Sequence, residues 1–138
     1  MEKQLVISSV LSNLNMIEIF LDQIFDEFSI SRSIYFPVLL SLNESVQNSI
    51  VHGNKNDAQK KVVIRAVLNH KKLKFLVEDQ GDGFDMNLIP DPTLPENICN
   101  ESGRGLFLIC KLADEVNLLE QGRIVEIKFK VHREYKIF

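Results

Sequence analysis

The feature that most constrains this chain is an amphipathic segment that ends at Gly53-Asn54. Glu44, Asn48 and His52 recur every four residues, and residues four apart on an α-helix differ by only about 40°, so all three share one stripe. The opposite stripe is apolar and contains Leu39, Leu42, Val46 and Ile50. The spacing predicts a helix that begins within residues 33–37, packs on a core, and ends in a left-handed cap at Gly53-Asn54.

The polar stripe of this helix has an unusual composition. A solvated helix face usually carries charges of both signs, whereas this stripe carries one carboxylate, one amide and one imidazole. Carboxylate and amide oxygens one turn apart suit a hard cation such as Mg²⁺. An ordinary polar helix face is the alternative interpretation of the same residues.

The rest of the chain alternates between strand and helix patterns. Strands are predicted at residues 3–8, 62–68, 73–78, 115–120 and 124–131, with turns at 69–72 and 121–122. Further helices are predicted from Ser12 or Asn13, as the capping residue, to about residue 28, and from about 106 to 114. Leu73, Phe75 and Val77 alternate with Lys74, Leu76 and Glu78, which indicates a sheet with one face on the helices and one face less buried. The fold class is therefore α+β.

A second motif, Asp79-Gln-Gly81-Asp-Gly83-Phe84, follows directly after the predicted strand 73–78. Glycines two residues apart allow a tight turn and a close approach of the backbone to a flat or bulky group. Asp79 stands at the strand end, where its carboxylate can be held rigidly. A plain turn rich in Asp and Gly is the alternative.

A third motif follows a long connection. Residues 86–102 contain three prolines and little periodicity, which predicts a functional or mobile loop. Gly103-Arg104-Gly105-Leu106 then opens the predicted helix, where free N–H groups and the helix dipole favour an anion. Arg104 would add bidentate positive charge. A glycine-containing helix start with a solvated arginine is the alternative.

In this order, the motifs resemble the N, G1 and G2 boxes of the GHKL ATPase superfamily, and most closely the small anti-sigma-factor serine kinases within it. The resemblance covers nearly the whole chain and rests on residues 44–54, 79–84, 91–97 and 101–109. It implies one histidine-kinase-like ATPase domain over residues 1–138. The implied fold is the Bergerat type, a two-layer α/β sandwich whose mostly antiparallel sheet has helices on one face. ATP would lie between sheet and helices, under residues 86–102 as a lid.

The resemblance also implies how the nucleotide is bound. Asn48 would coordinate the Mg²⁺ that bridges the ATP phosphates. Asp79 would accept a hydrogen bond from the adenine amino group, and Gly81 and Gly83 would complete this part of the cofactor site, with Gly83 allowing close approach.

The phosphates and the chemistry fall to the remaining site residues. Gly103, Arg104 and Gly105 would cradle the phosphates at the helix that Leu106 opens. Glu44 would be the general base that takes the proton from the incoming hydroxyl, which suits phosphoryl transfer, where the protein mainly positions groups and neutralises charge.

The implied function is an ATP-dependent protein serine kinase that acts as an anti-sigma regulatory factor. It would phosphorylate a Ser of a STAS-domain antagonist, sequester a sigma factor and form a homodimer. Two alternatives stay open: an ATP-dependent binding switch without kinase activity, and the ATPase module of a histidine kinase. Glu44 speaks against the last, since histidine kinases usually have Asn there. Residues 123–130 lack the Thr that commonly reaches the adenine pocket, which speaks for the switch.

Composition sets the broad class. A net charge of −3 gives no case for a nucleic-acid partner. No apolar run approaches the ~20 residues of a membrane span, and the first residues lack the apolar segment of a signal peptide. Cys99 and Cys110 are too few for a disulfide framework, so we expect a cytoplasmic protein.

Overall fold

The computed structural model of the chain describes residues 1–82 and 106–134. Residues 1–82 form two strands and two helices before a third strand, joined by short helical turns: β1 (Glu2–Ser8), η1 (Leu11–Leu14), α1 (Asn15–Glu27), η2 (Arg32–Ile34), α2 (Tyr35–Asn48), η3 (Ser49–Gly53), β2 (Lys61–Asn69) and β3 (Lys72–Glu78). Residues 106–134 add one helix and a strand pair: α4 (Leu106–Leu112), β4 (Glu115–Leu119), η5 (Glu120–Gly122) and β5 (Ile124–Lys130).

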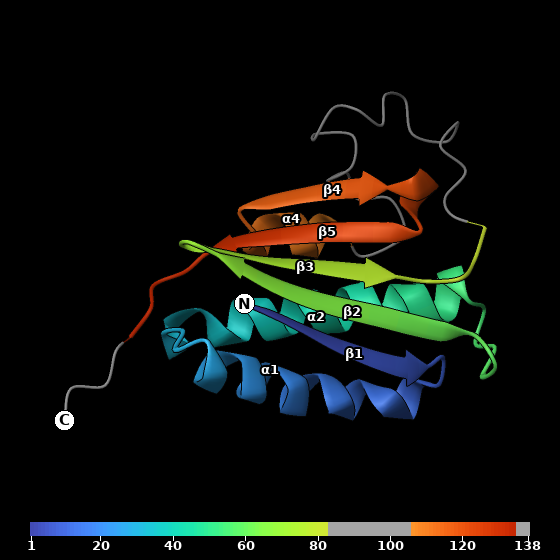
Figure 1. The fold of residues 1–138 in the computed structure, drawn as a ribbon. Helices are drawn as coiled ribbons and strands as arrows, with labels where there is room; N and C mark the ends of the chain where they lie inside the picture. Colours follow the sequence, from blue (N-terminus) through green and yellow to red (C-terminus); the bar gives the residue numbers. More distant parts are fainter. Residues whose placement is uncertain (83–105, 135–138) are drawn as a thin grey trace.

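The strands form one sheet in the order β1-β2-β3-β5-β4, and every neighbouring pair is antiparallel. Three of the four pairings join strands that are also consecutive along the chain. The fourth joins β3 to β5, with Glu78 opposite Ile124 and Lys72 opposite Lys130. This ladder unites the two described parts of the chain at the middle of the sheet (Figure 1).

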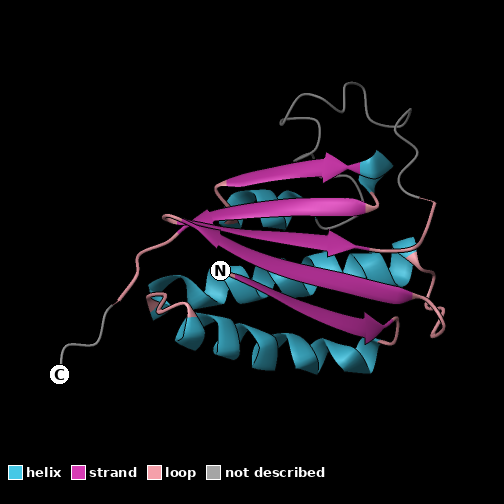
Figure 2. Cartoon of the chain, viewed as in Figure 1, coloured by secondary structure: helices cyan, strands magenta, loops and turns pink. Residues whose placement is uncertain are grey.

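All helices cover one face of the sheet (Figure 2). Leu73, Phe75 and Val77 of β3 are fully buried against them, as their alternation predicts. The same core takes in the apolar stripes of α1 and α2, with Leu21, Leu42 and Val46 fully buried. The predicted α+β sandwich with an antiparallel sheet and helices on one face is therefore confirmed.

The predicted cap of the first helix is wrong. α1 begins at Asn15 after a 3₁₀ turn, and Leu14 stands at its N-cap position without a side-chain hydrogen bond. Asn13 instead donates from Nδ2 to the carbonyl oxygen of Ser8, at 3.0 Å, and to the Ser8 hydroxyl, also at 3.0 Å. Its amide holds the end of β1 because the chain turns back there.

α2 begins as predicted, with Pro37 in its first turn, and the helical segment ends at Gly53-Asn54 as predicted, but the predicted left-handed cap is wrong. The α-helix stops at Asn48 and continues as a single π-helical turn, in which the Asn54 N–H reaches the Ser49 carbonyl at 2.8 Å. Asn54 has a right-handed backbone (φ −90°), and the left-handed residues are Lys55 and Asn56. Such π-turns are frequent at functional sites.

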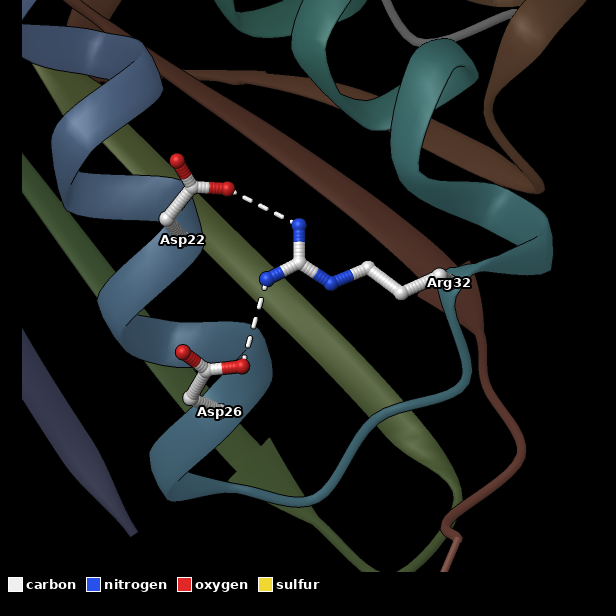
Figure 3. Close-up of polar contacts among 3 residues, drawn as sticks. All are labelled: Asp22, Asp26 and Arg32. Carbon is white, nitrogen blue, oxygen red and sulfur yellow. Dashed lines mark hydrogen bonds and ion pairs between the residues drawn. The ribbon is translucent and has the colours of Figure 1, made fainter.

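Arg32, in the turn between α1 and α2, ties the two helices together (Figure 3). Its Nη1 lies 2.8 Å from Asp22 Oδ1 and its Nη2 lies 3.2 Å from Asp26 Oδ1, while the guanidinium stacks 4.9 Å from the centre of the Tyr35 ring. The hydrogen bond from Arg32 lowers the pKa of Asp22, and burial raises the pKa of Tyr35 to about 12. About half of the Arg32 and Asp22 side chains stays exposed.

The structure bears on the predictions about membrane spans and about cysteines. Across residues 1–82 and 106–134, no helix is both long and apolar enough to cross a bilayer. Cys110 of α4 is disulfide-bonded. This differs from our expectation, because a sequence with only two cysteines did not predict a disulfide.

Candidate functional site

Asp79 lies directly beyond the end of β3 and is buried. Its backbone N–H donates to the Arg123 carbonyl oxygen at 3.0 Å, which fixes it beside the start of β5. Its carboxylate Oδ1 accepts the Gly81 N–H at 2.8 Å. The carboxylate is thus held at one end of the two central strands, as its place in the sequence predicts.

Two glycines make room for this carboxylate. A Cβ at Gly53 would lie 2.3 Å from Asp79 Oδ2, and a Cβ at Gly81 would lie 2.1 Å from the Gly53 carbonyl oxygen. Neither distance is tolerable, so any side chain at either position would displace its neighbours. The close backbone approach predicted for Gly81 exists, but its partner is the end of η3. Gly53 is therefore required for space rather than for a left-handed backbone.

Asn54 joins the segments around Asp79 and is almost fully buried. Its Nδ2 donates to the Ser9 hydroxyl at 2.8 Å and to the Lys61 carbonyl at 2.9 Å, and its Oδ1 accepts the Gln80 N–H at 2.7 Å. We call these residues, Ser9, Asn54, Lys61 and Gln80, the Asn54 cluster. One amide links the ends of β1 and η3, the start of β2 and the residue after Asp79. The sequence predicts only that Asn54 ends a helix. It does not predict these hydrogen bonds, because the partners lie far from Asn54 along the chain.

A small pocket brings together residues from all three sequence motifs. It is lined by Ser45, Asn48, Ser49, Asp79, Leu106, Gly122 and Val125. Asn48 comes from α2, Asp79 from the end of β3, and Leu106 from the first residue of α4. Three of the predicted site residues therefore share one cavity between the sheet and the helices.

Sequence reasoning missed the serines of this pocket. Ser41, Ser45 and Ser49 recur every four residues and are all buried, and this periodic run of small polar residues on an apolar helix was the available signal. Ser45 Oγ has no hydrogen-bond partner among the residues that the structure describes. A buried hydroxyl of this kind beside a pocket favours a polar ligand there.

The other predicted residues lie at different distances from the pocket. Glu44 is half-buried on α2, one turn before Asn48, and is not among the lining residues. His52 is exposed in η3. Four predicted site residues lie outside the described residues: Gly83, Gly103, Arg104 and Gly105.

The wall that β5 contributes to this pocket is apolar. β5 contributes Val125, whose side chain has the branched shape of threonine without its oxygen. In the described residues, no group of three His, Cys, Asp or Glu side chains is arranged to hold a metal ion.

Comparison with known proteins places this geometry among its relatives. The sequence pattern of the histidine kinase-like ATPase domain matches residues 8–129. The chain is 29% identical over 104 residues to the serine-protein kinase RsbW of Bacillus licheniformis, a match that covers 69% of this chain and 64% of that protein. It is 30% identical over 92 residues to the serine-protein kinase RsbW of Staphylococcus aureus strain JH9, a match that covers 62% of this chain and 58% of that protein. The chain thus spans about three fifths of the length of these curated relatives.

Proposed function

Because the chain belongs to the histidine kinase-like ATPase domain family, we propose that it binds ATP and acts as a protein serine kinase and anti-sigma regulatory factor. In this proposal it transfers the ATP γ-phosphate to a Ser of a STAS-domain antagonist and sequesters a sigma factor. Relatives named as serine-protein kinases support the transfer. The observation that carries the proposal is the pocket that joins Asn48, Asp79 and Leu106.

The groups around the pocket suit recognition of an adenine base, for which the described cavity of about 10 Å³ would have to widen. Asp79 supplies a buried carboxylate acceptor for an exocyclic amino group, and the Gly81 N–H holds that carboxylate in place. Leu106 and Val125 supply apolar walls for a flat ring. Ser45 adds a hydroxyl that can donate or accept. With no threonine on β5, recognition of the base depends more heavily on Asp79.

We propose that the ATP phosphates bind near Asn48 and the third motif. The Asn48 amide oxygen is a suitable ligand for Mg²⁺, which when bound neutralises charge on the phosphates. We assign Gly103, Arg104 and Gly105 to the phosphates on the strength of their sequence, since anions favour glycine-opened helix starts with an arginine.

Glu44 would act in the transfer itself. Its carboxylate takes the proton from the partner's Ser hydroxyl, the oxygen bonds to the γ-phosphorus, and the bond from that phosphorus to the bridging oxygen breaks to leave ADP. Glu44 is half-buried one turn from Asn48, so it stands next to the proposed metal ligand without occupying the nucleotide pocket.

Glu44→Gln tests this proposal, because glutamine keeps the shape and cannot accept the proton. Phosphorylation of a candidate STAS partner should fall by about 10²–10⁴-fold, the usual range for a general base. ATP affinity should stay unchanged. Glu18→Gln, at an exposed position on α1, is the matched control and should retain full activity. Normal phosphorylation by Glu44→Gln would exclude Glu44 as the base.

One second function has an observation in its favour. β5 contains no threonine and its residue in the pocket is Val125, which fits an ATP-dependent switch that holds a partner without phosphorylating it. Parent protein that binds ATP and partner but yields no phosphoserine would establish the switch.

We also propose a homodimer. Val6, Val10 and Leu11 carry exposed apolar side chains at the N-terminal end of the sheet, and burial against a second copy would remove them from water. Light scattering that gives a 15.8 kDa monomer at high concentration would refute the dimer.

A further inference from the structure

The sheet face opposite the helices carries a compact block of lysines. Lys72 lies opposite Lys130 and Lys74 lies opposite Lys128 on the central strands β3 and β5. These residues alternate with the buried Leu73, Phe75, Ile127 and Phe129, so their side chains leave the sheet on the face opposite the helices. Figure 2 shows the helices on the other face of the sheet. Like charges directly opposite one another destabilise a sheet. Two such pairs side by side weaken the sheet unless an anion joins them.

The protein itself neutralises only part of this charge. Lys128 pairs with Glu115 at 2.8 Å and with Glu126 at 3.5 Å. Within residues 1–82 and 106–134, no ion pair is formed by Lys72, Lys74 or Lys130. Positive charge thus remains on a chain whose net charge is −3.

The lysine block borders a hollow that is lined by Val67, Asn69, His70, Lys71, Lys72, Lys74 and Lys128. Val67 lies opposite Lys74 on β2, half-buried, and forms an apolar floor. The hydrocarbon stems of the lysines extend this floor while their ammonium groups stay in water. The hollow therefore offers both apolar contact and positive charge.

We propose that this hollow binds an extended acidic segment of a partner protein, with carboxylates at alternate positions and apolar side chains among them. Lysines two apart on one strand are separated by about 6.6–6.8 Å, which is also the spacing of alternate side chains on an extended peptide. Carboxylates at that spacing can meet Lys72 and Lys74 together, and an apolar neighbour can rest on Val67.

The surroundings favour a peptide over a nucleic acid. Glu2 lies opposite Val67 on one side of the hollow, and Glu115 and Glu126 lie on the other, so a continuous phosphate backbone would meet carboxylates at both borders. Among the residues of the lining that the structure describes, none is an arginine for bidentate phosphate contacts and none is a Phe, Tyr or Trp for base stacking.

The hollow and the nucleotide pocket are separate. Lys72 and Lys74 lie at the start of β3 on the open face, whereas Asp79 follows the end of β3 in a pocket shared with α2 and α4. The two sites can therefore be tested one at a time, and this inference does not depend on the kinase proposal.

The experiment uses the full chain and a fluorescein-labelled peptide of alternating glutamate and valine, with a glutamine–valine peptide as probe control. The parent should bind the glutamate peptide, more weakly as salt rises, and should not bind the control. Lys72→Gln/Lys74→Gln should bind it about tenfold more weakly. Lys55→Gln/Lys111→Gln removes the same charge from exposed positions elsewhere and should bind like the parent.

Two further measurements keep the outcome clear. The thermal midpoint of Lys72→Gln/Lys74→Gln should equal or exceed that of the parent, because a like-charge repulsion is removed, and its ATP affinity should be unchanged. Absence of peptide binding to the parent, or equal binding by both double variants, would overturn the proposal. Tighter binding of an oligothymidylate than of the peptide would replace it with a nucleic-acid site.

Discussion

Two polar clusters tie together segments of this molecule, and they differ in burial and in charge. The Asn54 cluster is neutral and its central amide is almost fully buried, with every side-chain hydrogen bond of that amide between 2.7 and 2.9 Å. The Arg32 cluster, which consists of Arg32, Asp22 and Asp26, is charged and about half-exposed. The first lies beside the pocket that Asn48, Asp79 and Leu106 line, and the second lies at the turn between α1 and α2.

The difference between these clusters is where their free energy comes from. Water competes for an exposed ion pair and its side chains remain mobile, so such a pair contributes little. A buried amide has no water to return to, so breaking its hydrogen bonds leaves polar groups stranded. The neutral cluster should therefore stabilise the fold more than the charged one, although the charged one has the stronger individual attractions.

Asn54→Ala should have the largest effect on stability. It removes three side-chain hydrogen bonds and strands the Gln80 N–H, so the free energy of unfolding should fall by about 2–4 kcal/mol. Asn15→Ala, at an exposed helix position, is the matched control and should stay within about 0.5 kcal/mol. Urea denaturation of both variants measures this; a loss at Asn54 no larger than at Asn15 would remove the distinction between the clusters.

Asp79→Asn sharpens the comparison by separating the site from the cluster that positions it. Asparagine can still accept the Gly81 N–H, whereas the charged acceptor for the adenine amino group is lost, so ATP binding should weaken by about 1–3 kcal/mol. Asp57→Asn, in the exposed loop after η3, is the control. Isothermal calorimetry that gives Asp79→Asn the ATP affinity of the parent would refute the adenine assignment.

Arg32→Ala should cost less than about 1 kcal/mol, because both of its ion pairs are open to solvent. Arg32→Lys keeps the charge and loses the two-armed contact, and it should fall between the parent and the alanine variant. Thermal unfolding at low and high salt measures both. A loss near that of Asn54→Ala would show that stacking on Tyr35, rather than the ion pairs, carries the stability.

The smallest expected effect is a change with pH in the stability difference between the parent and Arg32→Ala. Arg32 lowers the pKa of Asp22 below its ordinary value of 3.8, so the Asp22 contribution is fully present above pH 3.8. As pH falls from 3.8 through the lowered value, the unfolded chain takes up its proton first and the contribution is lost. The stability gap between the parent and Arg32→Ala should therefore narrow below pH 3.8. A gap that is constant down to pH 2 would contradict this.

The sequence predicted the strands well because their burial follows a local period of two. Leu73, Phe75 and Val77 show the buried face without knowledge of the neighbouring strands. Helix caps were predicted less well: the Asn13 side chain bonds to Ser8 instead of capping α1, and Asn54 ends the helical segment without the expected left-handed backbone. The left-handed turn falls two residues later than expected, at Lys55-Asn56.

The candidate site divides in the same way. Asn48, Asp79 and Leu106 were predicted from local motifs, and the structure brings all three to one pocket. The roles of Asn54 and Gly53 could not be predicted, because Ser9, Lys61 and Gln80 become neighbours only once the sheet has formed. The order of the strands was also out of reach, since nothing local shows that β3 pairs with β5 rather than with β4.

The pairing of β3 with β5 also affects how fast the protein folds and how the length of the connection between these strands matters. Among the strands that the structure describes, it is the one ladder between non-consecutive strands, so it closes a large loop of chain, and its formation should limit the folding rate. Loop closure entropy grows only slowly with length, by about 0.6 kcal/mol for each doubling. A change in the length of the connection from Glu78 to Ile124 therefore adds little to the cost of loop closure, whereas residues lost from α4 or β4 would remove buried core side chains such as Ile109 and Val116.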